Sequence, residues 1–135
     1  MIGLVIVAHG TLAEALLAAT EHVVGAMPGA ISIAIGPNDD LAERRAEIDK
    51  AVGAVNAGAG VVVVTDMFGG TPSNLAHSAL ADPDVEIIYG ANLPLLVKLA
   101  KMRDKPLGEA VDAAIAAGRK YVNSAGSILG TAKSS

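Results

Sequence analysis

The chain contains no cysteine, and aromatic residues make up only 2% of its sequence. The absence of cysteine excludes disulfides and thiolate metal sites, and it fits a reducing compartment. With so few aromatic residues, the core must be built from Val, Ile, Leu and Ala. That composition is typical of a parallel sheet covered by closely packed helices. A chain of 135 residues is long enough for one such core, so we expect a single domain at residues 1–130.

Positive charge is also scarce, since 10 Lys and Arg residues stand against 14 Asp and Glu, giving a formal net charge of −4. The basic residues are not gathered into one stripe, which argues against a nucleic-acid partner. The apolar run of residues 2–8 has no cation before it and is too short for a signal peptide or a membrane span. We therefore expect a cytoplasmic protein without direct membrane insertion, whose small polar tail at residues 131–135 frays.

Four apolar runs predict buried strands, because continuous β-branched residues leave neither face of a strand for water. These runs are Ile2–Val7, Ala30–Ile35, Val61–Thr65 and Val85–Tyr89. The segments between them repeat apolar residues at helical spacing. Strands that alternate with helices predict an α/β fold, with a parallel sheet and right-handed crossovers.

Polar residues mark where several predicted helices begin. Thr11 and Asp40 each precede a helical pattern and have a glutamate three residues later, which predicts two capping boxes. Thr71 followed by Pro72 predicts another helix start, with a hydroxyl cap and a proline in the first turn. Near the end of the chain, Ser127–Leu129 predicts a short last strand.

Polar and glycine residues follow the predicted strands. His9 comes after the first strand, Gly36 after the second, Asp66 after the third and Asn92 shortly after the fourth. In open parallel sheets, ligands bind at the carboxyl ends of the strands, beside the point where the strand order reverses. We therefore predict a functional site at this edge, with Gly10, Gly36 and Asn92 lining its pocket.

His9 and Asp66 are the candidate reactive pair. If the first and third strands are neighbours, as in the usual doubly wound orders, Asp66 could accept a hydrogen bond from one imidazole nitrogen of His9. That bond would fix the tautomer and leave the other nitrogen as a nucleophile. Two alternatives stay open: His9 could be a core histidine bonded to a backbone carbonyl, and Asp66 could simply form a turn.

The segment "GGTPSN" at residues 69–74 is a candidate phosphate-binding loop. Gly69 and Gly70 allow the backbone to approach a ligand closely, and the free amides of a first helical turn attract anions. Thr71 and Ser73 could add hydroxyl donors, although Thr71 could instead cap the helix and Ser73 could be solvated. The segment does not match a nucleotide-binding loop, so ATP binding is not indicated.

A nucleophilic imidazole, an orienting carboxylate and an anion-binding helix start together suggest phosphoryl transfer through phosphohistidine. No Lys or Arg occurs in residues 8–11, 66–74 or 90–94. A phosphoryl group there would be held by neutral donors, with each bond to the charged group contributing roughly 1.5–3 kcal/mol. Such moderate stabilisation suits a relay that gives its phosphate away, whereas a bidentate arginine clamp would suit a trap.

Three segments carry a resemblance to a known family: "VAHG" at residues 7–10, "DMFGGTPSN" at 66–74 and "GANLPLL" at 90–96. Over nearly the whole chain, the sequence resembles the mannose-type (mannose/fructose/sorbose) IIA component of the bacterial phosphoenolpyruvate-dependent phosphotransferase system. The resemblance implies that His9 accepts a phosphoryl group from the histidine-containing phosphocarrier protein and passes it to a IIB domain, while Asp66 hydrogen-bonds His9. It implies no metal or other cofactor. Because this chain ends at residue 135, the IIB protein is expected to be separate.

The resemblance also implies a fold and an assembly. The fold is an open three-layer sandwich, with a central parallel sheet of order 2-1-3-4 and helices on both faces. Family members form homodimers by exchanging a C-terminal antiparallel strand. Ser127–Leu129 is the segment expected to form that strand here.

Met67 and Phe68 follow Asp66 in the same loop. They are interpreted either as locally packed side chains or as part of a docking surface, and docking is favoured for Phe68, the one phenylalanine of the chain. A small tetrapyrrole metal chelatase that uses His9 and His77 is an enzymatic alternative, although His77 is expected to be solvated on its helix. A regulatory protein that reports its phosphorylation state would use the same His9.

Overall fold

The fold is built around a four-stranded, all-parallel sheet in the order β2-β1-β3-β4. The structure is a computed structural model that describes residues 1–67 and 69–130. Its strands are β1 (Gly3–His9), β2 (Ala30–Ile35), β3 (Val61–Thr65) and β4 (Val85–Ile88). Each strand overlaps a predicted run, and the sheet order that the resemblance implies is confirmed.

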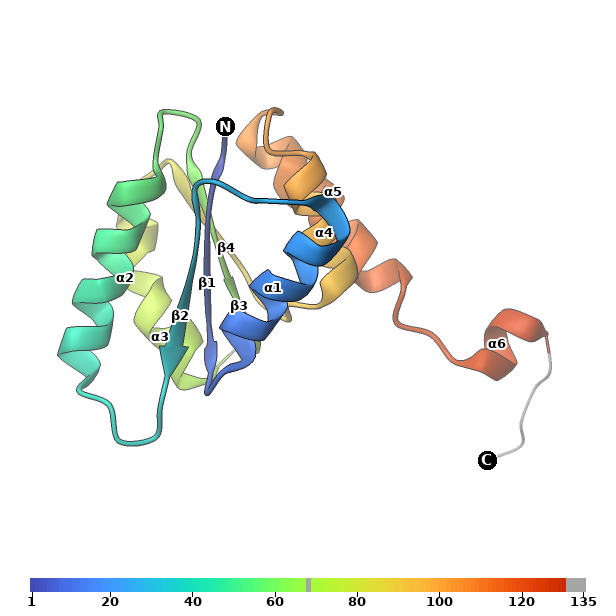
Figure 1. The fold of residues 1–135 in the computed structure, drawn as a ribbon, viewed down its shortest axis with the longest axis horizontal. Helices are drawn as coiled ribbons and strands as arrows, with labels where there is room; N and C mark the ends of the chain where they lie inside the picture. The colour runs from blue at the N-terminus through green and yellow to red at the C-terminus, as the bar shows by residue number, and fades with distance from the viewer. Residues whose placement is uncertain (68, 131–135) are drawn as a thin grey trace.

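Helices cover both faces of the sheet, which makes a three-layer sandwich (Figure 1). On one face lie α1 (Leu12–Val24), α4 (Leu93–Lys101) and α5 (Leu107–Lys120). On the other face lie α2 (Leu41–Val55), α3 (Thr71–Ala76) and the 3-10 helix η1 (His77–Ala81). The predicted α/β class is therefore confirmed. Within the residues that the structure describes, no helix is both long and apolar enough to cross a bilayer.

The strands are buried on both faces because their side chains alternate between two separate cores. In β1, Leu4 and Ile6 pack in the core beneath α1, α4 and α5, whereas Val5 and Val7 pack in the core beneath α2 and α3. These four side chains are at most 1% exposed. The double burial explains why the strand is continuously apolar in the sequence, and it leaves the polar residues to the strand ends.

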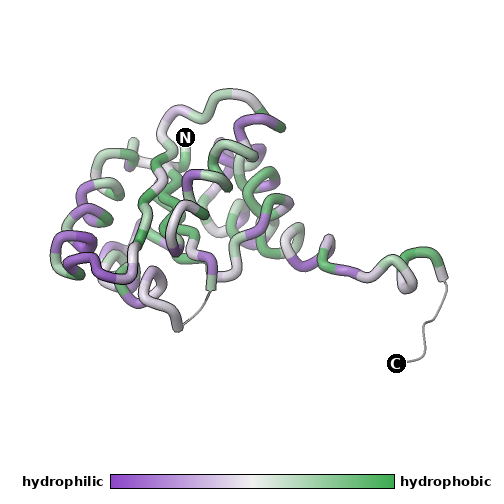
Figure 2. The backbone as a smooth tube through the Cα atoms, turned by 60° about the horizontal axis from the view of Figure 1, so that its bottom comes forward, coloured by the Kyte–Doolittle hydropathy of each residue, from purple (hydrophilic) through white to green (hydrophobic). Residues whose placement is uncertain are grey.

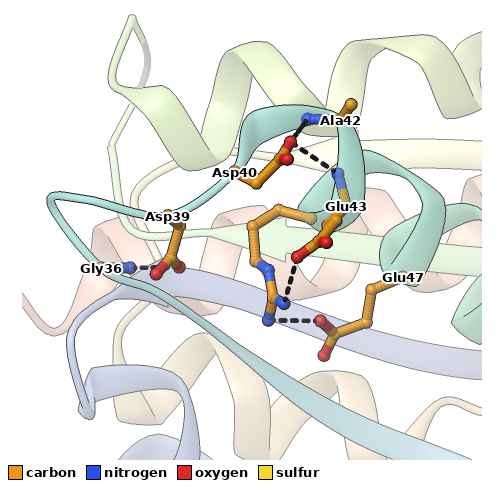
Figure 3. Close-up of polar contacts among 7 residues, drawn as sticks. Gly36, Asp39, Asp40, Ala42, Glu43 and Glu47 are labelled. Atoms are coloured by element: carbon orange, nitrogen blue, oxygen red, sulfur yellow. Dashed lines mark hydrogen bonds and ion pairs between the residues drawn. The ribbon is translucent and has the colours of Figure 1, made fainter.

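The helix starts confirm one predicted cap and correct two others. The Asp40 carboxylate accepts hydrogen bonds from two first-turn amides of α2 at 2.9 and 3.3 Å, as its capping pattern predicts (Figure 3). Thr11 makes no side-chain cap bond to any described residue, because its backbone angles of −91° and 7° are not the extended ones that a cap requires. Gly70, and not Thr71, is the N-cap of α3, so its extended backbone moves Thr71 into the first turn.

The end of the described chain also differs from the prediction. Ser127–Leu129, predicted as a strand, lies in the short helix α6 (Ala125–Leu129), so that prediction is wrong. The Ser124 hydroxyl caps this helix by accepting from the Ser127 amide at 3.1 Å, and Gly130 ends it with a left-handed φ of 72°. These two local signals outweigh the short apolar run. α6 projects away from the rest of the molecule (Figures 1 and 2), and the tail predicted to fray, 131–135, lies outside the described residues.

Arg103 bridges the segments that precede β1 and β2 at the amino-terminal edge of the sheet. It lies in the link between α4 and α5 and is only 6% exposed. Its Nε donates to the Ile2 carbonyl and its Nη2 donates to the Pro28 carbonyl, each at 2.7 Å. Burial lowers the pKa of the Arg103 guanidinium. The partners lie 101 and 75 residues away in the chain, so no local pattern reveals this contact.

Candidate functional site

His9 and Asp66 meet at the carboxyl edge of the sheet. His9 is the last residue of β1, and Asp66 directly follows β3, the neighbour of β1 in the sheet. The His9 Nδ1 atom lies 2.7 Å from Asp66 Oδ2, and the His9 backbone amide donates to the same oxygen at 3.1 Å. The His9 side chain is 50% exposed, so it is not a core histidine. The structure thus brings the predicted pair into direct contact.

The charge of Asp66 decides which nitrogen of His9 carries a proton. Burial raises the pKa of Asp66, but the hydrogen bonds from His9 and the attraction to its charge lower it, and the net pKa lies below the ordinary value of 3.8. Asp66 is therefore ionised at neutral pH and can only accept hydrogen bonds. In the neutral imidazole of His9, Nδ1 must then be the donor, which leaves Nε2 with a free lone pair.

Gly70 places the start of α3 against the free side of the His9 ring. A Cβ atom built on Gly70 would lie 3.0 Å from His9 Cε1 and 3.5 Å from His9 Nε2. Any other residue at this position would therefore push against the ring. The absent side chain lets the backbone at the beginning of the helix, whose first-turn amides have no partner within the helix, come close to Nε2.

The loop before α3 is held by a buried hydroxyl. Ser73 is fully buried, and its Oγ accepts a hydrogen bond from the Gly69 amide at 3.4 Å. Ser73 is therefore not solvated, and its hydroxyl is engaged within the loop. Gly69 has a φ of 84°, which favours glycine. Thr71 is an exposed residue in the first turn of α3.

The three residues predicted to line a pocket stabilise loops at the same edge. Gly10 turns the chain after β1 with a φ of 57°. The Gly36 amide donates to the Asp39 carboxylate at 2.7 Å (Figure 3). The Asn92 side chain caps α4, and its Nδ2 donates to the Gly118 carbonyl at 3.0 Å. A ligand-binding role for these three residues stays a prediction.

His77 lies in η1 and is half-buried, so the expected solvated position is wrong. Its Nε2 lies 2.8 Å from the Tyr89 hydroxyl, and the two rings meet edge to face with centroids 5.8 Å apart. Sequence reasoning missed this pair, because only the packing of η1 against β4 brings the rings together. Among the residues described, no group of three or more His, Cys, Asp or Glu is placed to hold a metal ion. The chelatase alternative therefore gains no support from the structure.

The loop after Asp66 carries an accessible apolar side chain. Met67 directly follows Asp66 and is 55% exposed. Phe68, the other predicted docking residue, lies outside the described residues. An exposed methionine beside a half-exposed histidine suits contact with a macromolecule better than enclosure of a small ligand.

Known proteins resemble this chain over most of its length. The family model for the PTS system fructose IIA component matches residues 3–116. The PTS system mannose-specific EIIAB component of Escherichia coli (strain K12) is 30% identical over 124 residues, which are 90% of this chain and 38% of that protein. The present chain thus spans well under half the length of this relative.

Solved structures show the same fold. The mannose/sorbose specific IIA subunit of the phosphotransferase system from Enterococcus faecalis superposes with a TM-score of 0.81 at 26% identity, covering 91% of this chain and 93% of that one. The PTS IIA protein associated with the fucose utilization operon of Streptococcus pneumoniae gives a TM-score of 0.78 at 28% identity, covering 90% and 91%. The similarity therefore extends over almost the full length of each structure.

Proposed function

Because the chain belongs to the family of PTS system fructose IIA components, we propose that it is a phosphocarrier of the sugar phosphotransferase system whose acceptor atom is His9 Nε2. The observation that carries this proposal is the 2.7 Å contact between His9 Nδ1 and Asp66 Oδ2. It fixes one ring nitrogen as a donor to an ionised carboxylate and leaves the other as the nucleophile.

The proposed transfer starts from the phosphorylated histidine of the histidine-containing phosphocarrier protein. The lone pair of His9 Nε2 attacks phosphorus as the P–N bond of the donor breaks, and the donor imidazole leaves with that electron pair. The ring of His9 gains positive charge, which the carboxylate of Asp66 stabilises through Nδ1–H. In the next step, a nucleophile on a IIB domain attacks the phosphorus, and the new P–N bond breaks in the same way.

The backbone at the start of α3 supplies the proposed phosphate contacts. The amides of Gly70 and Ser73, with the amide and hydroxyl of Thr71, would bind the phosphoryl oxygens, since Gly70 lies against the Nε2 side of the ring. The Gly69 amide donates to Ser73 Oγ and would hold the loop in shape. Among the described residues of the three loops at this edge there is no Lys or Arg. The absence of a cationic clamp supports a transient phosphoryl group that is readily passed on.

The proposed partners dock at the carboxyl edge of the sheet. The exposed side chain of Met67, together with Phe68, would contact the donor and the IIB domain in turn. Both partners of such a relay work on the cytoplasmic side of a sugar transporter, so we place the protein in the cytoplasm.

We also propose a homodimer formed through the C-terminal arm, defined as residues 121–130. Four of its apolar side chains, Tyr121, Val122, Ile128 and Leu129, are 64–75% exposed. β4 is an edge strand, and a hollow of about 890 Å³ lies beside it, next to α5. An arm from a second copy would cover this edge and bury the arm's own apolar residues. Analytical ultracentrifugation of the full chain and of a chain ending at residue 120 tests the assembly: a monomeric full chain would contradict it.

The decisive experiment is phosphorylation with phosphoenolpyruvate and the purified general phosphotransferase proteins, followed by mapping of the labelled residue. We expect one phosphoryl group on His9, with the acid lability and alkali stability of a phosphoramidate. Label on another residue, or an acid-stable bond, would remove His9 as the acceptor.

A further inference from the structure

A groove of about 630 Å³ runs between α4 and α5, on the side of these helices that faces away from the sheet. On the α4 side its wall is formed by Leu93, Pro94 and Val97. On the α5 side it is formed by alanines at positions 113, 116 and 117. These small side chains leave an open space with an apolar floor, which is the surface that an amphipathic helix needs for docking.

Three lysines line this groove: Lys98, Lys101 and Lys120. No Asp or Glu lines it, and all three lysines are exposed. In the part of the chain that the structure describes, none of them forms an ion pair with a carboxylate. The chain as a whole has a formal charge of −4, so this groove has the opposite sign to the molecule that carries it. A local field of this kind attracts an acidic partner.

The lysines stand at both ends of the groove. α4 and α5 run antiparallel, since the Asn92 side chain at the start of α4 donates to the Gly118 carbonyl near the end of α5. Lys101 lies in the last turn of α4 and Lys120 in the last turn of α5, so they are at opposite ends. Helix dipoles favour lysine at these positions, but they do not account for the apolar floor between them.

From this arrangement we infer that the groove binds an acidic amphipathic helix of a partner protein. The apolar face of that helix would lie on the floor, and carboxylates toward both of its ends would pair with the lysines. α4 has nine residues, so the wall is about 14 Å long and accommodates roughly two and a half turns of a docked helix. A bilayer surface is flat and would reach the lysine tips without filling the recessed floor.

This surface is separate from the phosphate relay. None of the groove residues contacts His9, Asp66 or the start of α3 through a hydrogen bond or ion pair within the described chain. Substitutions in the groove should therefore leave labelling of His9 unchanged. Failure of the docking proposal can thus be told apart from failure of the proposed phosphocarrier function.

The test uses the full chain and a fluorescent helical peptide of about 14 residues, with leucines along one face and glutamates toward both ends. A second peptide carries lysine in place of each glutamate. By fluorescence anisotropy, we expect the acidic peptide to bind at least about tenfold more tightly than the lysine peptide, with the difference shrinking in high salt.

Two variants locate the binding. Ala116→Trp places a bulky side chain on the exposed α5 wall, and Lys98→Glu combined with Lys101→Glu reverses the charge at one end. Each should weaken binding of the acidic peptide by about tenfold or more. The matched controls are Ala46→Trp and Lys50→Glu, which alter exposed positions of α2 on the opposite face of the sheet, and they should leave the affinity unchanged.

Three results would overturn the inference. The first is binding of neither peptide, or equal binding of both. The second is an Ala116→Trp variant that binds the acidic peptide as tightly as the unmodified chain does. The third is binding to phosphatidylglycerol vesicles that depends on Lys98 and Lys101 when the acidic peptide does not bind, which would assign the lysines to a membrane surface.

Discussion

The amino and carboxyl edges of the parallel sheet each hold a side chain that bridges distant segments, but the two side chains differ in burial and in their hydrogen-bond partners. At the amino edge, Arg103 is buried and donates to two backbone carbonyls. At the carboxyl edge, His9 is half exposed, its Nδ1 contacts Asp66, and its Nε2 faces Gly70. A buried side chain that donates its hydrogen bonds to backbone carbonyls stabilises the fold. A half-exposed ring with one nitrogen fixed and the other free is suited to chemistry.

The largest expected effect is the loss of phosphorylation in His9→Ala. Without the imidazole there is no nucleophile, so labelling from phosphoenolpyruvate and the general phosphotransferase proteins should vanish. Thermal stability should change little, because His9 is half exposed. The matched control is His22→Ala, which removes an exposed histidine of α1 and should be labelled normally. Residual labelling of His9→Ala would mean that another residue accepts phosphate.

Asp66→Asn tests whether the charge of the carboxylate that contacts His9 matters for phosphoryl transfer. The amide can still accept a hydrogen bond, but it lacks the charge that would stabilise a phosphorylated ring in the proposed mechanism, so the rate of labelling should fall by about 100-fold. Rapid-quench measurement of phosphoryl transfer would give this rate, and circular dichroism would show that the fold is retained. A rate within a factor of about two of the unmodified chain would remove Asp66 from the mechanism.

Arg103→Met should produce the opposite phenotype at the amino edge. It leaves two carbonyls near the sheet edge without their charged donor, and we expect the free energy of unfolding to drop by about 2–4 kcal/mol. Labelling of His9 should persist wherever the variant is folded. Urea unfolding measures the effect, with Lys105→Met, an exposed position two residues on, as the control. Equal losses in the two variants would show that the Arg103 contacts do not stabilise the fold.

Gly70→Ala tests the close approach of α3 to the His9 ring. The added Cβ would lie 3.0 Å from Cε1, so the ring or the helix start must shift. Overpacking of this kind costs about 1–3 kcal/mol, and a cost of that size borne by the reactive arrangement corresponds to a decrease in the labelling rate of roughly 5- to 150-fold. Gly53→Ala, in α2 where an added Cβ meets no atom within 4 Å, is the matched control. Unimpaired transfer in Gly70→Ala would show that the ring does not depend on this spacing.

The smallest expected effect concerns pH. The pKa of Asp66 in the folded protein lies below its ordinary value of 3.8. The ionised carboxylate therefore stabilises the fold fully above pH 3.8. This stabilisation is lost as the pH falls through the lower pKa of the folded state. Urea unfolding between pH 2 and pH 7 should therefore show a steeper acid loss of stability for the unmodified chain than for Asp66→Asn. If the free energy of unfolding depended on pH in the same way in both proteins, the lowered pKa of Asp66 would be contradicted.

Two of the predictions that proved wrong, those for Thr11 and His77, share a physical cause. Thr11 has the residue type of a cap, but the turn at Gly10 gives it the wrong backbone angles. His77 looked like a surface residue of a helix, yet the packing of η1 on β4 brings it to Tyr89. In both cases the outcome depended on the path or packing of the surrounding chain, which a local pattern does not contain.

The four strands, their alternation with helices and the residues at the strand ends could be predicted from the sequence alone, because burial on both faces demands continuous apolar runs and confines polar groups to the edges. The tertiary structure was needed to show that His9 Nδ1 reaches Asp66, that Gly70 stands against Nε2 and that Arg103 bridges distant segments at the amino edge. These contacts join residues up to 101 positions apart in the chain, so they become fixed only when the layers pack together.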